Sequence, residues 1–246
     1  MNILLLMAGP SDKFREAGHT FPKNLVEIEG RPIIQHVIEN VSPLLSARNR
    51  LIVVLNQQEI LRFHTDAVAR LLVPDVHICE ALGVTKGAAC SALLAIDKID
   101  SDTPLVICYG DQVVRADLPA AVADFETRQL DGGLIVFEDV HPRWSFVKCN
   151  AEGLVVEAAE KRPISRMATA GFYYFARGRD FVRAATRMIL KDSNVEGAFF
   201  VCPSYNELLL ENARIGVHSI PRSAYFSMAT PQGAQTYAEY LKKQKS

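Results

Sequence analysis

Short apolar runs that alternate with helical patterns limit the fold of this chain more than any other feature. Because these runs are apolar at successive positions, they are typical of strands covered on both faces, as central parallel strands are. The alternation over the first 130 residues therefore predicts a doubly wound parallel sheet with right-handed crossovers. The runs are Asn2–Met7, Leu51–Leu55, Val76–Cys79, Leu105–Cys108 and Gly133–Phe137.

Helices are expected between these strands. Pro32 suits the first turn of a helix, and apolar residues then recur at spacings of three and four as far as Val41. The patterns of Gln57–Leu72 and Thr85–Ile99 also predict helices.

The second half of the chain has a different pattern. Two strand-like runs, Trp144–Cys149 and Leu154–Ala159, flank the turn-forming segment Asn150–Gly153, and this arrangement predicts a hairpin. No linker rich in proline, glycine or serine interrupts the chain, so we expect one domain over residues 1–246. Further strands are expected at Gly171–Phe175 and Ile215–Ile220, and further helices at Asp180–Lys191, Tyr205–Asn212 and Pro231–Lys243.

The composition excludes several classes of protein. With 49 % hydrophobic and 22 % charged residues, the chain is not expected to be disordered. Its 27 Lys+Arg and 28 Asp+Glu give a net charge of −1, so neither nucleic acid nor a membrane is expected as a partner. The five scattered cysteines include no C-x-x-C pair, and a short N-terminal apolar run without a basic segment is unlike a signal peptide. A cytoplasmic location is therefore expected.

Two loops in the first part of the chain could carry chemistry. In open α/β sheets, ligands bind beyond the carboxyl ends of the strands. The segment Ala8–Phe14 follows the first strand directly, and its backbone N–H groups could hold phosphate oxygens, although an ordinary surface turn is the alternative. Lys23 follows a proline in a long loop and could neutralise charge on a transferred phosphoryl group, with a solvated surface lysine as the alternative.

An aspartate follows the fourth predicted strand. Asp111, in the segment Gly110–Gln112, is well placed to bind a Mg²⁺ ion that bridges phosphate groups. The alternative is an aspartate that caps a turn. No G-x-G-x-x-G follows the first strand, which argues against a nicotinamide-dependent dehydrogenase, and no Ser/His/Asp arrangement indicates a hydrolase.

The order A-G-x-x-x-[KR]-F … P-K-x-L-x-x-[IV]-x-G-[KR]-P-[IL]-I strongly resembles the N-terminus of the sugar nucleotidyltransferases, the nucleoside-diphosphate-sugar pyrophosphorylases. The block Phe21–Ile34 is its most specific part. The resemblance implies a Rossmann-like, glycosyltransferase-A type fold with a mixed, mainly parallel central sheet flanked by helices. It also implies a Mg²⁺-dependent enzyme that joins a nucleoside triphosphate and a sugar 1-phosphate to give a nucleotide-sugar and pyrophosphate.

The resemblance extends over nearly the whole chain and implies a role for each matching residue. It implies catalytic roles for Lys13, Lys23 and Asp111, and Asp111 would also hold the metal. Glu160, Lys161 and Gly171 would bind the sugar phosphate. The small residues after Thr85 would let the backbone approach a nucleobase closely. The residues expected to bind the nucleotide are Ala8, Gly9, Pro10, Ser11, Thr85, Gly87 and Ala88.

Three broader expectations follow from the same resemblance. Residues 1–140 form the nucleotide-binding part and residues 141–246 the sugar-phosphate-binding part. Segments such as Trp144–Val147 and Ile164–Ser165 are most similar to the branch tied to capsules and surface polysaccharides. Family habit suggests a homo-oligomer.

The chain also departs from the family pattern. Its phosphate loop usually reads G-x-G-[ST]-R, but here Ser11, Asp12 and Lys13 stand at the last three positions, and lysine lacks the planar fork of arginine. Ser227 stands two residues before Ala229-Thr230-Pro231, where many members have a metal-binding aspartate. Two alternatives therefore stay open. One is a regulatory protein that binds a nucleotide or nucleotide-sugar without catalysis, and the other is a cytidylyltransferase for a non-sugar phosphorylated acceptor.

Overall fold

The computed structural model describes residues 1–46 and 48–245. Within these residues one sheet of nine strands runs in the order β10-β9-β11-β6-β1-β4-β5, and β8 and β12 extend it beyond the free side of β11. The strands of this sheet are β1 (Asn2–Leu6), β4 (Arg50–Asn56), β5 (His77–Ala81), β6 (Leu105–Tyr109), β8 (Gly132–Glu138), β9 (Ser145–Cys149), β10 (Val155–Glu160), β11 (Met167–Phe175) and β12 (Ile215–Ser219).

The first predicted strands form the parallel centre of the sheet. β1 pairs in parallel with β4 and with β6, and β4 pairs in parallel with β5. Leu4 lies opposite Ile52 on one side and opposite Ile107 on the other, and all three side chains are fully buried. Burial on both faces explains why β1, β4 and β6 are mostly apolar, whereas β5, at the edge of the sheet, is largely half-buried and contains His77 and Glu80.

The fifth predicted strand is present, but its place in the sheet corrects the expectation of a central parallel strand. β8 pairs antiparallel with β11, which itself lies antiparallel to β6, and β8 pairs in parallel only with β12. The antiparallel β11 separates β8 from the parallel centre. A run that is covered on both faces is apolar whichever direction its neighbours take, so the sequence pattern does not reveal this.

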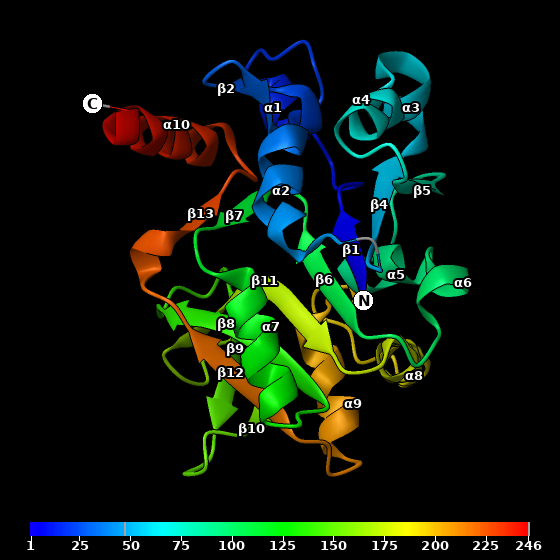
Figure 1. The fold of residues 1–246 in the computed structure, drawn as a ribbon, viewed down its shortest axis with the longest axis vertical. Helices are drawn as coiled ribbons and strands as arrows, with labels where there is room; N and C mark the ends of the chain where they lie inside the picture. The colour runs from blue at the N-terminus through cyan, green and yellow to red at the C-terminus, as the bar shows by residue number, and fades with distance from the viewer. Residues whose placement is uncertain (47, 246) are drawn as a thin grey trace.

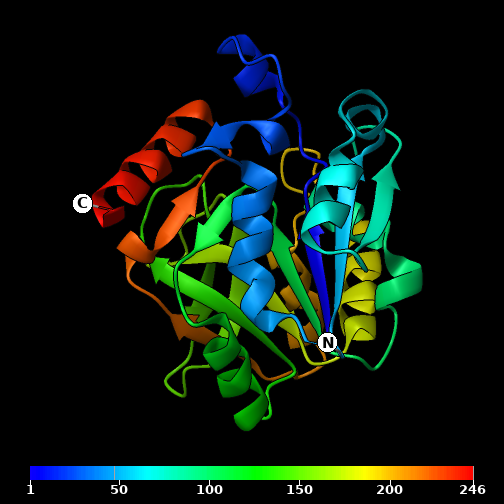
Figure 2. The same ribbon diagram turned by 45° about the horizontal axis from the view of Figure 1, so that its top comes forward.

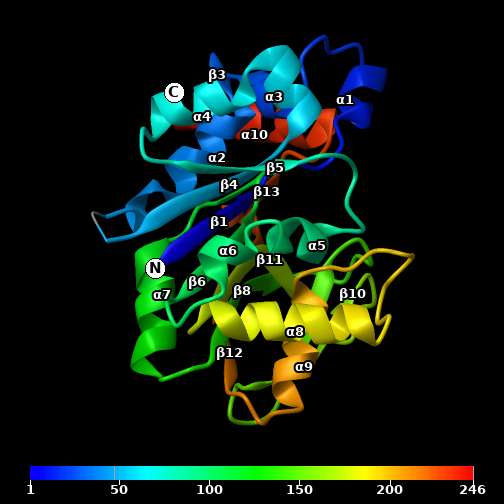
Figure 3. The ribbon, with the colours of Figure 1, turned by 90° about the vertical axis from the view of Figure 1, so that its right-hand side faces the viewer.

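Helices cover both faces of the sheet (Figure 1). α2, α7 and α10 contribute to the hydrophobic core on one face, and α5, α6, α8 and α9 contribute to the core on the other. Figure 3 shows β1, β4 and β5 between α2 on one side and α5, α6 and α8 on the other. The helices are α1 (Asp12–Glu16), α2 (Ile33–Val41), α3 (Gln57–Phe63), α4 (Thr65–Leu72), α5 (Ala88–Leu93), α6 (Ile96–Ile99), α7 (Leu118–Thr127), α8 (Gly178–Leu190), α9 (Tyr205–Leu209) and α10 (Pro231–Lys245).

Two of the predicted helices are each divided in two. His64 adopts a left-handed conformation, with φ of 54°, and ends α3 with a hydrogen bond from its N–H to the carbonyl oxygen of Ile60. Its own carbonyl oxygen accepts hydrogen bonds in the first turn of α4. The predicted helix Thr85–Ile99 begins only at Ala88 and is interrupted between α5 and α6. These breaks depend on single backbone conformations, which hydrophobic periodicity does not report.

Two small sheets and α7 lie outside the sequence-based assignments. β2 (Glu27–Ile28) pairs with β3 (Arg31–Pro32), and β7 (Gln112–Val114) pairs antiparallel with β13 (Tyr225–Ser227). The C-terminal helix α10 contacts β2 and β13 (Figure 2). The predicted hairpin is confirmed, because β9 pairs antiparallel with β10.

Over the part of the chain that the structure describes, no helix is both long enough and apolar enough to pass through a lipid bilayer.

Candidate active site

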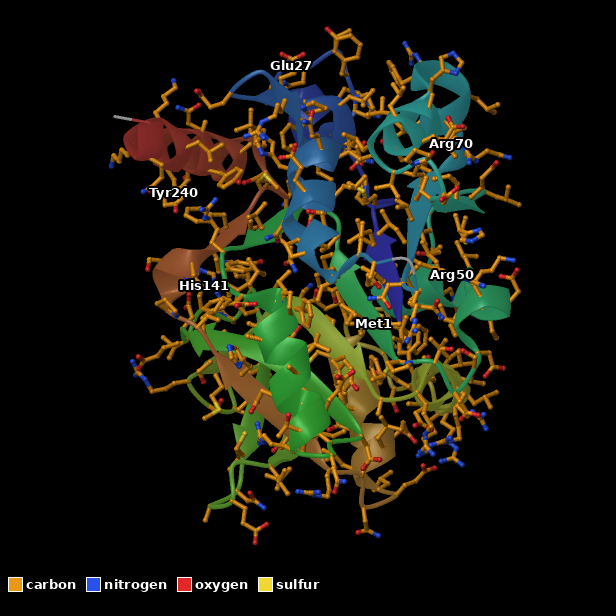
Figure 4. All side chains as sticks on the ribbon, in the orientation of Figure 1. Met1, Glu27, Arg50, Arg70, His141 and Tyr240 are labelled. Carbon is orange, nitrogen blue, oxygen red and sulfur yellow. The ribbon has the colours of Figure 1, made fainter. Side chains whose placement is uncertain are left out.

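A cavity of about 420 Å³ opens at the carboxyl ends of the central strands. In Figure 4 the labels Met1 and Arg50 mark the amino ends of β1 and β4, and the cavity lies at the opposite ends of these strands. This is the edge at which open α/β sheets bind ligands, and the volume lies within the range of about 300–1,000 Å³ that is typical of small-molecule sites. The residues that line it include the glycines Gly9 and Gly171 and the charged residues Lys23, Asp111, Glu160 and Lys161.

Lys23 and Asp111 meet in this cavity. Lys23 begins the short 3₁₀ helix Lys23–Leu25, and its Nζ lies 2.6 Å from Oδ2 of Asp111. The lysine side chain is only 6 % exposed, whereas the aspartate side chain is 25 % exposed. A buried ammonium group requires a partner of opposite charge, and the structure supplies it. The structure thus brings these two groups together, and their catalytic roles stay predictions.

Tight backbone packing holds Asp111 at the end of β6. A Cβ atom on Gly110 would lie 2.2 Å from the side chain of Met7, so only glycine lets this turn pass so close to β1. The carbonyl oxygen of Asp111 accepts a hydrogen bond from the N–H of Met228 at 2.6 Å. Ser227, which also lines the cavity, lies opposite Gln112 in the β7–β13 pair. β13 thus brings Ser227 beside the segment that carries the aspartate.

The carboxylates of this site suit a metal only in company with other ligands. Among the described residues that line the cavity, Asp111 and Glu160 are the carboxylates, and the described part of the chain holds no cluster of three or more His, Cys, Asp or Glu side chains fit for a metal. Mg²⁺ commonly uses one or two carboxylates together with substrate phosphates and water. Asp111 therefore fits as the protein ligand of a Mg²⁺ ion that is shared with bound phosphate groups.

The residues of the loop after β1 differ in whether they line this cavity. Ala8, Gly9 and Pro10 line the cavity, and a Cβ atom on Gly9 would lie 3.4 Å from Nζ of Lys23. Ser11 is buried and lines a second hollow of about 500 Å³ on the other side of the loop. Its Oγ donates a hydrogen bond to Glu59 and accepts one from the backbone N–H of Lys23.

The charged residues that follow this loop lie further out. Asp12 pairs with Arg15 at 3.1 Å, and both side chains are largely exposed. Lys13 is exposed on α1, and among the described residues it is not one of those lining either hollow. The structure therefore does not bring Lys13 together with Lys23 and Asp111, and its catalytic role stays a prediction.

The expected nucleotide-binding residues before α5 line the cavity. Thr85 donates a hydrogen bond from Oγ1 to the carbonyl oxygen of Gly87 at 3.1 Å, and Ala88 follows on the same wall. Gly87 has φ of 105°, and a Cβ atom there would lie 2.4 Å from the carbonyl oxygen of Phe199. The glycine is thus required by its backbone conformation and by packing against Phe199.

Glu160 and Lys161 also line the cavity. Glu160 ends β10, is 8 % exposed, and its Oε2 accepts a hydrogen bond from the hydroxyl of Ser145. Burial raises the pKa of Glu160 to about 7, and the hydrogen bond from Ser145 and the charge of Lys161 oppose this rise. The ammonium group of Lys161 pairs with Glu196 and lies 5.7 Å from the ring centre of Phe200. Both predicted residues therefore line the cavity.

Gly171 lies in an irregular stretch of β11. Its φ is 61°, and a Cβ atom there would lie 2.3 Å from the side-chain amide of Gln112. That amide donates to the carbonyl oxygen of Ala170 at 2.6 Å and accepts from the hydroxyl of Tyr225 at 3.0 Å. The glycine therefore gives room to a buried amide beside Asp111.

Several further cavity residues were not predicted. Asn56 and Tyr109 end β4 and β6, so the rule that ligands bind at the carboxyl ends of strands could have identified both. Trp144 contacts the rings of Phe137 and Tyr225, with centres 5.5 and 5.4 Å away, and also lines the cavity. Other unpredicted residues of the wall are Ser91, Arg143, Ser145, Thr169, Tyr173 and Phe200.

Comparisons with known proteins agree with this architecture. A family model described as Nucleotidyl transferase matches residues 2–197. The UTP–glucose-1-phosphate uridylyltransferase AglF of Haloferax volcanii is 27 % identical over 180 residues, which cover 71 % of this chain and 72 % of the relative. The bifunctional protein GlmU of Methanocaldococcus jannaschii is 26 % identical over 220 residues, which cover 80 % of this chain and 48 % of the relative. The chain thus matches about half of that longer protein.

A solved structure has the same fold. The nucleoside-diphosphate-sugar pyrophosphorylase from Vibrio cholerae superposes with a TM-score of 0.83 at 24 % identity, covering 96 % of this chain and 99 % of the other. The predicted mixed, mainly parallel sheet flanked by helices is thereby confirmed.

Proposed function

Because the chain belongs to the nucleotidyl transferase family, we propose that it joins a nucleoside triphosphate to a sugar 1-phosphate and releases pyrophosphate. In this reaction an oxygen of the sugar phosphate attacks the α-phosphorus, a new phosphorus–oxygen bond forms, and the bond to pyrophosphate breaks in line. No covalent bond to the protein is needed, so catalysis rests on positioning and on stabilisation of charge.

The observation that carries the proposal is the Lys23–Asp111 pair in the cavity wall. Negative charge spreads over the oxygens of the transferred group during phosphoryl-type transfer. Lys23 holds a pre-placed positive charge in a sheltered position, where such a charge stabilises a transition state more strongly than in water. Asp111 would hold Mg²⁺, which would neutralise charge on the phosphates.

The remaining walls supply the binding contacts of the proposal. In this proposal the backbone at Gly9 and Pro10 binds the triphosphate, and the cavity residues near Gly87 bind the nucleobase. Glu160 and Lys161, which also line the cavity, bind the sugar phosphate. Residues 1–140 then act as the nucleotide-binding part and residues 141–246 as the sugar-phosphate-binding part. Lys13 contributes to triphosphate binding only if α1 moves toward the cavity.

The relatives support a sugar phosphate as the acceptor. AglF carries the name of an enzyme for UTP and glucose 1-phosphate, whereas a non-sugar acceptor has no such support among the named relatives. A cytoplasmic location, which rests on the scattered cysteines and the N-terminal run, is part of the proposal. A homo-oligomeric state and a place in capsule or surface-polysaccharide synthesis complete it, and these two rest on the sequence resemblance.

One observation favours a second candidate, a nucleotide or nucleotide-sugar binding protein without catalysis. Ser227 stands beside the Asp111 segment, where a second carboxylate would strengthen a metal site. Binding of a nucleotide without turnover across a broad panel of acceptors would favour this candidate.

Pyrophosphate release tests the proposal directly. Each nucleoside triphosphate is combined with a panel of sugar 1-phosphates and Mg²⁺, and the productive pair is then used for variants. Lys23→Ala and Asp111→Ala are each expected to lower kcat by on the order of 10²–10³. Lys148→Ala, at an exposed position of β9 outside the cavity, serves as the control. Turnover like that of the wild type in both cavity variants would contradict the assigned roles.

A further inference from the structure

A half-buried carboxylate outside the main cavity joins the two loops that form the site. Glu59 lies on α3, and each of its oxygens accepts a hydrogen bond. Oε1 accepts from the hydroxyl of Ser11 at 2.8 Å, and Oε2 accepts from the side-chain amide of Asn24 at 3.1 Å. Ser11 belongs to the loop after β1, and Asn24 to the turn that carries Lys23, so one side chain ties both loops to α3.

The same contacts reach the backbone of Lys23. Its N–H donates to Oγ of Ser11 at 3.0 Å, and the amide of Asn24 also donates to the carbonyl oxygen of Met7 at 2.9 Å. Asn24 is fully buried. Two hydrogen bonds that lead to Glu59 therefore fix successive residues of the turn, and the Lys23 ammonium group extends from this fixed backbone to Asp111.

The helix that carries Glu59 is itself anchored. The side-chain oxygen of Asn56, at the end of β4, accepts hydrogen bonds from the N–H groups of Gln58 and Glu59 at 2.9 and 3.3 Å. This capping arrangement fixes the first turn of α3 to the sheet. The backbone that carries the carboxylate is thus anchored to the central sheet.

These contacts also explain why serine suits position 11. At this position glycine would leave the backbone free to approach a phosphate, but it would offer no hydroxyl. The Ser11 side chain points away from the main cavity, donates to Glu59 and accepts from Lys23. Its presence is therefore compatible with an open phosphate loop and adds a bridge that glycine lacks.

We propose that Glu59 is a positioning residue, which holds the Lys23 ammonium group in place against Asp111 through Ser11 and Asn24. This inference rests on the proposed function for its kinetic consequence, but not for its structural one. Burial raises the pKa of Glu59, whereas the hydrogen bonds from Ser11 and Asn24 lower it, as expected for a carboxylate that is sheltered and satisfied.

Substitutions of Glu59 separate this role from simple stability. In Glu59→Ala, kcat is expected to fall by on the order of 10–10², the range that follows from misplacement of a catalytic group by about 1 Å, with little change in KM for either substrate. In Glu59→Gln, the amide can accept from Asn24 and donate to Ser11, so kcat stays within a few-fold of the wild type. Glu152→Ala, in the exposed hairpin turn, is the matched carboxylate control and leaves both constants unchanged.

Ser11 provides the second arm of the experiment. Ser11→Gly removes both hydrogen bonds of the Ser11 hydroxyl, the one donated to Glu59 and the one accepted from Lys23, and kcat is expected to fall by about 10-fold. Because both groups act through one chain of hydrogen bonds, the double variant Ser11→Gly/Glu59→Ala is expected to be no slower than Glu59→Ala alone. Losses that multiply in the double variant would overturn the proposal.

A structural measurement makes the outcome independent of turnover. Crystal structures of the wild type, Glu59→Ala and Glu59→Gln would show whether the contact of 2.6 Å between Lys23 and Asp111 persists. Its loss in Glu59→Ala, with retention in Glu59→Gln, supports the positioning role even if no substrate pair is turned over, in which case the proposed function alone fails. An unchanged contact in Glu59→Ala would overturn the positioning role. If Glu59→Ala does not fold, Ser11→Gly provides the same two readouts.

Discussion

Replacement of Glu160 by glutamine is expected to change how the stability of the fold depends on pH. Burial raises the pKa of this carboxyl group from an ordinary value of 4.5 to about 7 in the folded chain. Between these two pH values the folded protein keeps a proton that the unfolded chain has released. Stability therefore falls as pH rises through this window, because the free energy of unfolding decreases wherever the native state binds more protons.

The size of the effect follows from the same two values. Each pH unit between the folded and unfolded pKa corresponds to about 1.4 kcal/mol, so ionisation of Glu160 costs the native state about 3 kcal/mol by pH 8. Glutamine has no proton to release and can still accept the hydrogen bond from Ser145. Relative to the wild type, Glu160→Gln should gain about 3 kcal/mol of stability between pH 4 and pH 8.

Urea unfolding of both proteins at several pH values measures this difference. The free energy of unfolding is obtained by linear extrapolation at each pH, and the contributions of all other titrating groups cancel in the difference between the two proteins. The difference should be flat below about pH 4.5, rise up to about pH 7 and flatten again. A difference that stays constant from pH 4 to pH 8 would refute the reasoning, because Glu160 would then titrate alike in the folded and unfolded chains.

Three further substitutions test individual features of the cavity. Gly171→Ala places a Cβ at φ of 61° against a buried amide and should lower the free energy of unfolding by about 1–3 kcal/mol, measured by urea unfolding; an unchanged stability would contradict the packing described. Gly87→Ala should weaken nucleotide binding by at least several-fold in calorimetric titrations, because the new Cβ would displace the backbone of Phe199, and unaltered affinity would separate this wall from the nucleotide. Ser227→Asp adds a carboxylate beside Asp111 and should lower the Mg²⁺ concentration that gives half-maximal pyrophosphate release; no shift would mean that the side chain does not reach the metal.

The parts of the fold that the sequence predicts are those that depend on local burial. Continuous apolarity identifies β1, β4 and β6, because most residues of these strands are buried. β5 is also predicted, although it lies at the edge of the sheet and only Ala81 in it is buried. Because β1 and β6 pair in parallel, their carboxyl ends are neighbours, and the segments that carry Lys23 and Asp111 follow from these ends. The partner of a strand is a different matter, since β8 and β11 are as apolar beside antiparallel neighbours as they would be beside parallel ones.

The parts of the site that escape prediction depend on contacts between distant segments. Glu59 looks like one polar residue of a surface helix, and only the fold shows that both of its oxygens are used. Lys13 is the opposite case, because its place in the motif suggested a role in the cavity, but the short helix α1 carries it outward. Motif position fixes where the backbone of a residue lies along the strand edge. It does not fix the direction of a long side chain that no neighbour restrains.

The two departures from the family pattern, Ser11 and Ser227, differ in the hydrogen bonds that their hydroxyl groups make. Ser11 has a buried hydroxyl with one donated and one accepted hydrogen bond, so the surrounding residues are arranged for serine, and glycine would leave the oxygen of Glu59 without its donor. Ser227 has a weaker local bond, in which its hydroxyl accepts from the N–H of Ala229 at 3.4 Å, and its side chain also interacts with the hydroxyl of Tyr225. The phosphate loop is therefore rebuilt around its substitution, whereas the strand beside Asp111 merely has a smaller and uncharged side chain. If catalysis in this chain differs from that of its relatives, we expect the difference to arise at the metal site and not at the phosphate loop.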